Sequence, residues 1–196
     1  MSGRSCKSLL CAAAAAGFLT AGAQAEVLLV VDLSVMNQVT ITATNGLSAV
    51  TASGSDTTGV YFNNFYGVAG GSLADVLVAG DLTSAANTSD TSPDLYRATS
   101  GSDTGLNLWS WTDDTTVNFT AGAQAFSGSA TWTLTAAEYA DMVNGNTAGD
   151  LYFPADSSDD ISSADLIGQY EVVVPTPGAV SMLALGLGAG AIRRRR

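Results

Sequence analysis

Val39-Thr-Ile-Thr-Ala-Thr44 is the stretch of sequence that decides the fold, because apolar and threonine side chains alternate along it without interruption. Strict alternation places one kind of side chain on each face of an extended strand. Two further stretches repeat the pattern, Thr116-Val-Asn-Phe-Thr120 and Ala130-Thr-Trp-Thr-Leu-Thr135. Strands with one apolar and one polar face are typical of antiparallel sheets that are covered on one side. The sequence therefore predicts an all-β protein.

Seven more strands are predicted from short apolar runs that are bounded by Gly, Asn, Asp and Ser. They are residues 27–32, 47–53, 59–65, 76–82, 106–111, 151–153 and 167–174. About ten short strands in one domain indicate an antiparallel β-sandwich that is jelly-roll-like. The acidic segments 87–94 and 156–165 are expected to be surface loops.

One short helix is predicted within this β pattern. Thr135 and Glu138 have the spacing of a capping box, in which each side chain bonds to the backbone N–H of the other residue. Asn144-Gly145 is typical of a helix end in the left-handed conformation. The sequence therefore predicts a helix that follows Thr135 and ends at Val143.

Residues 1–25 have the order of a secretory signal peptide. Arg4 and Lys7 form a short basic region, residues 9–19 are apolar, and Ala23-Gln24-Ala25 has the form of a cleavage site. Cleavage is predicted before Glu26, so that residues 26–172 form the exported domain.

Residues 173–196 have the order of a membrane sorting signal. Pro175, Thr176, Pro177 and Gly178 form a turn, residues 179–192 carry no charge, and Arg193, Arg194, Arg195 and Arg196 follow. Arginines after an apolar segment resist translocation and stay on the cytoplasmic side. As a helix, residues 179–192 would be about 21 Å long against about 30 Å of hydrocarbon, which suits a transient anchor.

The turn, the apolar segment and the arginines together resemble the PEP-CTERM signal of bacterial exported proteins, with Thr176 where the family has glutamate. That signal is read by a membrane-embedded exosortase. The resemblance is confined to residues 173–196. It implies a C-terminal hydrophobic helix in the membrane, processing by an exosortase-like transpeptidase, and a final place at the cell surface or in the extracellular polysaccharide layer.

The predicted exported domain is strongly acidic. All 18 acidic residues of the chain lie between Glu26 and Glu171, where Arg97 is the only basic residue, so the net charge is 1 − 18 = −17. Nucleic acid is a poor partner for such a field. The chain has no histidine, and its cysteines, Cys6 and Cys11, and its lysine precede Glu26. These absences exclude the usual nucleophiles, bases and zinc ligands, so we expect a non-catalytic domain without a cofactor.

Two groups of residues are candidates for ligand binding. Asp156, Asp159 and Asp160 offer oxygen atoms close together in one loop, which suits a structural calcium ion. Trp109 and Trp111 share one face of a predicted strand and could present their rings to a sugar. Five more aromatic residues could join such a platform or form the core: Tyr61, Phe62, Phe65, Tyr66 and Trp132.

The sequence favours an exported, membrane-tethered surface or matrix protein whose folded domain is not catalytic. The alternative is a carbohydrate-binding module of the envelope or exopolysaccharide layer that uses Trp109 and Trp111. A third hypothesis is a carboxylate-dependent glycan hydrolase, because Asp113-Asp114 and Asp159-Asp160 supply the two kinds of carboxyl that glycoside hydrolysis needs.

Overall fold

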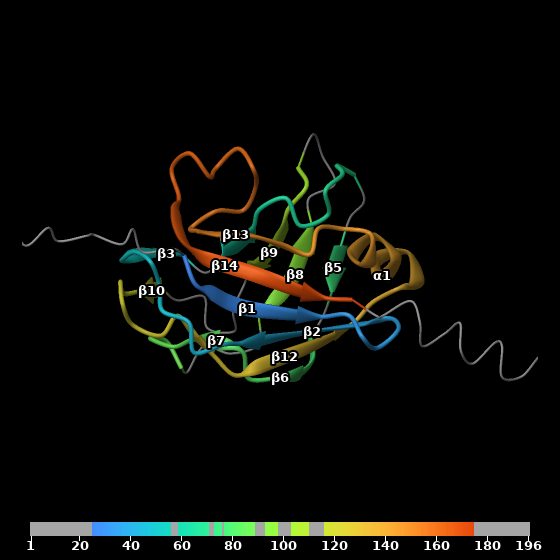
Figure 1. Cartoon of the computed structure of the whole chain (residues 1–196), viewed down its shortest axis with the longest axis horizontal. Helices are drawn as coiled ribbons and strands as arrows, with labels where there is room; N and C mark the ends of the chain where they lie inside the picture. Colours follow the sequence, from blue (N-terminus) through green and yellow to red (C-terminus); the bar gives the residue numbers. More distant parts are fainter. Residues whose placement is uncertain are drawn as a thin grey trace, which may run out of the picture.

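The protein is mostly β in the computed structural model, which describes residues 25–55, 59–70, 73–75, 77–88, 93–97, 103–109 and 116–174. These residues form fourteen strands and one helix (Figure 1). The strands are β1 (Val27–Asp32), β2 (Gln38–Ala43), β3 (Ala52–Ser55), β4 (Val60–Phe62), β5 (Leu73–Asp75), β6 (Leu77–Gly80), β7 (Thr83–Ser84), β8 (Asp94–Arg97), β9 (Leu106–Trp109), β10 (Thr116–Phe119), β11 (Phe126–Ser127), β12 (Ser129–Thr133), β13 (Ala148–Phe153) and β14 (Asp165–Val173). The helix is α1 (Ala136–Val143).

Ten of these strands form one mixed sheet in the order β5-β8-β9-β4-β13-β14-β1-β2-β12-β6. Its two edge strands, β5 and β6, are consecutive in the chain and only Val76 separates them. The end of one edge strand and the start of the other therefore lie within about 7 Å of each other. The sheet must curl for its edges to meet in this way. Two small sheets, β10–β3 and β11–β7, complete the fold.

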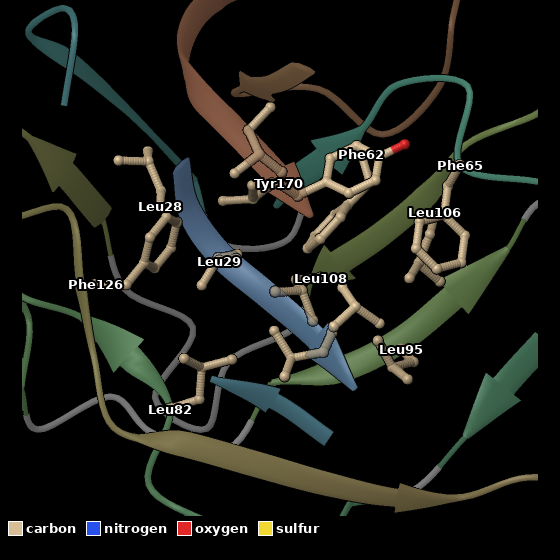
Figure 2. Packing of buried hydrophobic residues seen from close by; sticks show 14 of the residues in the cluster. Leu28, Leu29, Phe62, Phe65, Leu82, Leu95, Leu106, Leu108, Phe126 and Tyr170 are labelled. Carbon is tan, nitrogen blue, oxygen red and sulfur yellow. The ribbon is translucent and has the colours of Figure 1, made fainter. Parts of the chain in front are cut away.

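The curled sheet has two halves, β5-β8-β9-β4-β13 and β14-β1-β2-β12-β6. Apolar side chains from both halves form one core (Figure 2). In one half, Ile41 lies opposite Val31 on β1 and Ala130 on β12. In the other half, Leu108 of β9 lies opposite Leu95 of β8. All five side chains are buried. In β2 and β12 the alternation in the sequence thus directs every second side chain to the inside of the curled sheet.

The predicted all-β class with one short helix is confirmed, but the sheet differs from the expected antiparallel, jelly-roll-like sandwich. Its ten strands form one curled sheet, and β1 is parallel to β14 while its other neighbour, β2, is antiparallel. The register between β1 and β14 shifts between Val27 and Leu29. Leu28 and Leu29 are both buried because of this irregularity. Because β1 is apolar at five of its six positions, it carries no period-two pattern, and its sequence does not reveal the direction of its partner.

Several strand bounds also differ from the prediction. The strand expected at residues 47–53 is β3, which begins only at Ala52, and Leu47 forms just an isolated bridge with Gln124. Strand β8, which was not predicted, begins at Asp94, the last residue of the loop expected at residues 87–94. Strands β5, β7 and β11 have two or three residues each, which is too short for a periodic pattern.

The capping box at the start of α1 is confirmed, whereas the expected left-handed end is wrong. The Glu138 N–H donates to Thr135 Oγ1 at 3.3 Å, and the Thr135 N–H donates to Glu138 Oε2 at 2.7 Å. Asn144 at the C-cap is right-handed, with φ of −87°. Gly145 is needed for space instead, because a Cβ there would lie 2.5 Å from the Phe65 carbonyl oxygen.

Helix α1 covers one end of the curled sheet. The Tyr139 hydroxyl donates to the Leu33 carbonyl just after β1, at 2.6 Å. The Asn146 N–H donates to the Phe65 carbonyl after β4, at 2.9 Å. Figure 1 shows α1 at the end of the molecule towards which β1 and β14 point.

We expect Thr135→Ala to lower the free energy of unfolding by about 1 kcal/mol, because the substitution removes the oxygen that accepts from Glu138 N–H. Urea denaturation followed by circular dichroism measures this change. Thr135→Ser keeps the hydroxyl and serves as the control, with an unfolding midpoint close to that of the unmodified chain. Equal losses in the two variants would show that packing of the threonine methyl group, and not the cap, stabilises this helix.

Candidate functional site

Residues 175–196 of the predicted sorting signal lie outside the described part of the chain, as do residues 1–24. This holds for Pro175, Thr176, Pro177, Gly178, Arg193, Arg194, Arg195 and Arg196. The structure does show where the described part of the chain ends. Strand β14 lies in the middle of the sheet and ends at Val173, whose carbonyl accepts from Leu33 N–H at 2.8 Å. Within the described residues, no helix is long and apolar enough to cross a bilayer.

The predicted acidic loop joins β13 to β14, and hydrogen bonds of Ala155, the residue before the loop, tie its start to the sheet. Asn107 of β9 donates from Nδ2 to the Ala155 carbonyl at 2.6 Å, and the Ala155 N–H donates to the Gly59 carbonyl at 3.3 Å. Next to these bonds the Tyr61 hydroxyl donates to Asp103 Oδ1. Burial and the contact with Asp103 raise the pKa of Tyr61, so the phenol stays protonated and serves as a donor.

Of the three candidate calcium ligands, the structure brings Asp156 and Asp160 together. A side-chain hydrogen bond with Asp160, followed by burial and by the charge of Asp160, raises the pKa of Asp156. A hydrogen bond between two carboxyl groups requires that one of them holds a proton. No group of three or more acidic, histidine or cysteine side chains that could hold a metal occurs among the described residues. Calcium binding by Asp156, Asp159 and Asp160 stays a prediction.

We expect Asp160→Asn to lower the pKa of Asp156, because an amide can still donate to this carboxylate but adds no negative charge. Since the folded-state pKa of Asp156 is raised above its ordinary value of 3.8, the pair stabilises the fold at low pH. That contribution is lost as the pH rises through the raised pKa. Carboxyl-carbon NMR titration of both proteins measures the shift. An unchanged pKa of Asp156 would show that burial alone causes it.

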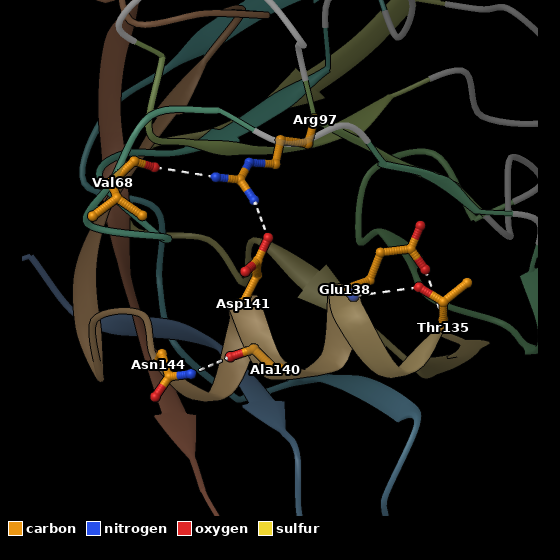
Figure 3. Close-up of polar contacts among 7 residues, drawn as sticks. All are labelled: Val68, Arg97, Thr135, Glu138, Ala140, Asp141 and Asn144. Atoms are coloured by element: carbon orange, nitrogen blue, oxygen red, sulfur yellow. Dashed lines mark hydrogen bonds and ion pairs between the residues drawn. The ribbon is translucent and has the colours of Figure 1, made fainter.

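The second polar cluster surrounds Arg97, the only basic residue between Glu26 and Glu171. Its guanidinium lies over the Tyr66 ring, 3.5 Å from the ring centroid. Nη1 lies 3.2 Å from Asp141 Oδ2 on α1, and Nη2 donates to the Val68 carbonyl at 3.1 Å (Figure 3). Arg97 is 4% exposed, whereas Asp141 is 54% exposed. The cation therefore joins β8, α1 and the segment after β4.

The sequence shows that Arg97 is the only basic residue between Glu26 and Glu171, but it does not show which residues Arg97 contacts. Its partners come from positions 66, 68 and 141, which are distant from it in the chain and belong to different elements. The usable signal was composition, since a lone cation among 18 acidic residues is expected to be paired. The cluster around Arg97 is therefore a structural contact that joins β8 to α1 and to the segment after β4.

The aromatic residues divide into a core set and two tryptophans. Tyr61, Phe62, Phe65, Tyr66 and Trp132 are all buried, so they cannot present their rings to a glycan. Trp109 is the last residue of β9, where it pairs with Asp94. Trp111 lies outside the described residues, and so does the carboxylate pair Asp113-Asp114 of the hydrolase hypothesis.

Comparison with known proteins gives no further guide to function. No protein-family model matches the chain. No curated protein matches it, and no solved structure matches it. Its function must therefore be argued from its own residues.

Proposed function

We propose that the protein is exported and is tethered to the membrane through residues 179–192. Residues 26–172 then form a non-catalytic domain on the outer side of the membrane. Pro175, Thr176, Pro177 and Gly178 are the recognition segment of an exosortase-like transpeptidase, which moves the domain from the membrane to the cell surface or the extracellular polysaccharide layer.

The observation that carries this proposal is the order of the chain. A basic, apolar and small-residue sequence at 1–25 precedes the domain, and a proline turn, an uncharged segment and four arginines follow it. Such an order directs the domain across a membrane and holds the following arginines on the cytoplasmic side. In support, β14 delivers the chain to Val173 at one end of the domain, directly before the proline turn.

The residue types of the domain support a non-catalytic role. Between Glu26 and Glu171 the chain contains no histidine, cysteine or lysine, and its single arginine is buried. General bases, nucleophiles and phosphate-binding groups are usually drawn from these residues. The net charge of −17 favours solubility in a saline exterior and disfavours nucleic acid.

The carbohydrate-binding alternative now depends on Trp109 and Trp111, because the other five aromatic residues of the set are buried. Two rings make a small platform for a sugar chain. Binding of the full chain to a panel of polysaccharides tests this alternative, with Trp109→Ala as the matched variant. If the protein binds a polysaccharide and Trp109→Ala abolishes that binding, the carbohydrate-binding module is favoured over a surface domain that has no glycan ligand.

Two variants of the sorting signal are expected to fail differently in an exporting bacterial host. Deletion of Arg193, Arg194, Arg195 and Arg196 removes the topological stop, so we expect full-length protein to be released or mislocalised. Replacement of Pro175 and Pro177 by alanine keeps the anchor but removes the extended turn, so we expect unprocessed precursor in the membrane.

Cell fractionation and mass spectrometry of the mature surface form measure both outcomes. The expected surface form lacks residues 1–25 and no longer ends at Arg196. A surface form that still ends at Arg196 would mean that the segment is a permanent anchor and that no transpeptidase acts on it. Surface material with an intact Met1 would contradict export through a cleaved signal peptide.

A further inference from the structure

We propose that the turn between β1 and β2 is a membrane-contacting tip, which inserts Val35 and Met36 into the lipid interface beside the anchor. The inference rests on the proposed tethering through residues 179–192 and assigns the side of the domain that faces the bilayer. The occupant of this apolar surface is therefore the lipid headgroup and upper acyl-chain region of that same bilayer.

The tip exposes apolar side chains where turns usually carry polar ones. Val35 is 56% exposed and Met36 is 74% exposed. The Gln38 N–H donates to the Val35 carbonyl at 3.2 Å and closes the turn, while Asn37 takes the left-handed conformation with φ of 59°. Both side chains are therefore solvent-exposed in a closed turn.

The tip lies beside the point at which the chain leaves the domain. Strands β1 and β14 are parallel, and Asp32 at the end of β1 pairs with Val173 at the end of β14. Val173 is itself 47% exposed. The Leu33 N–H donates to the Val173 carbonyl at 2.8 Å, which ties the start of the turn to the exit strand. Figure 1 shows the β1–β2 turn and the arrowhead of β14 at the same end of the molecule.

The covalent chain limits how far this end can stand from the bilayer. Six residue steps separate Val173 from Ala179, the first residue of the proposed anchor. They span at most about 21 Å even when fully extended. The linker therefore keeps the tip end within about 21 Å of the start of the anchor, and an interfacial segment needs to reach only about 5–10 Å into the headgroup region.

The distribution of charge favours the same orientation. The acidic loop with Asp156, Asp159 and Asp160 precedes β14, whose nine residues place it about 26 Å from Val173. At the tip end, the Asp32 carboxylate accepts from Ser34 N–H at 2.7 Å, and Asp141 pairs with Arg97. The acidic loop thus lies at the end of β14 that is far from the tip.

A fluorescent probe at position 36 tests the proposal in the full chain, with Cys6 and Cys11 replaced by serine so that Met36→Cys is the only thiol. The labelled protein is reconstituted in phosphatidylcholine vesicles, and flotation shows whether it attaches. Quenching by phosphatidylcholine with brominated acyl chains then reports the depth of the probe. Because Met36 is 74% exposed, the substitution should leave the melting temperature unchanged.

Leu47→Cys is the matched control, since Leu47 is also exposed and its N–H donates to Glu26 Oε2, at the opposite end of β1. We expect quenching at position 36 to exceed that at position 47 by about twofold or more. Flotation with equal quenching at both positions would contradict the proposed membrane-contacting tip but would be consistent with tethering through residues 179–192. Stronger quenching at position 47 would mean attachment through residues 1–25, and failure to float would overturn both tether and tip.

Discussion

Arg97→Met is expected to lower the free energy of unfolding by about 3 kcal/mol. The substitution keeps most of the buried stem but removes the charge that lies 3.5 Å from the centroid of the Tyr66 ring. It also removes the donor to the Val68 carbonyl, which leaves that carbonyl without its charged partner. The loss should appear as an earlier midpoint in urea denaturation followed by circular dichroism.

Asp141→Asn separates the ion pair from these buried contacts. Because Asp141 is 54% exposed, solvent screens its charge, and we expect a loss below about 1 kcal/mol. An amide oxygen can still accept from Arg97 Nη1, so the geometry of the pair is kept. If Asp141→Asn were as destabilising as Arg97→Met, the ion pair and not the contact with Tyr66 would stabilise this junction.

The strands that could be predicted well from the sequence are those with one solvent-exposed face and one buried face. Strands β2 and β12 alternate apolar residues with threonine, and their paired Thr40 and Thr131 side chains lie 2.9 Å apart through their hydroxyls. Strand β1 is apolar at almost every position, so its existence could be predicted but not its parallel pairing with β14. The direction of a partner is set by contacts across the whole chain, which no local pattern contains.

The candidate sites were predictable to different degrees. The position of the acidic loop followed from its composition, whereas the approach of Asp156 to Asp160 depends on the turns within that loop, such as the Asp160 N–H bond to the Ser157 carbonyl. The apolar residues Val35 and Met36 could be read from the sequence, but not that they lie beside the exit of β14. Their significance depends on a parallel strand pair that the sequence does not reveal.

Trp132→Ala should be the most destabilising single substitution in the sheet, with a loss of about 4 kcal/mol. The indole is fully buried on β12, opposite Val39 of β2. Its Nε1 donates at 3.2 Å to the carbonyl of Pro93, which immediately precedes β8 in the other half of the curled sheet. The side chain therefore fills the interior and also bonds across it, so alanine would leave a cavity and an unpaired carbonyl.

Trp132→Phe separates these two contributions. It keeps an aromatic ring in the same place but removes the N–H, so we expect a loss of about 1–2 kcal/mol from the bond to Pro93 and the smaller ring. Circular dichroism is the suitable probe, because removal of a tryptophan alters the fluorescence itself. Trp132→Ala with nearly unchanged stability would contradict the buried position and reopen this residue as a surface ring for glycans. A large loss of unfolding free energy in Trp132→Ala, together with a small loss in Trp132→Phe, would identify the main contribution of this residue. It would show that an aromatic ring packed inside the curled sheet stabilises the contact between the two halves more than the single hydrogen bond to Pro93 does.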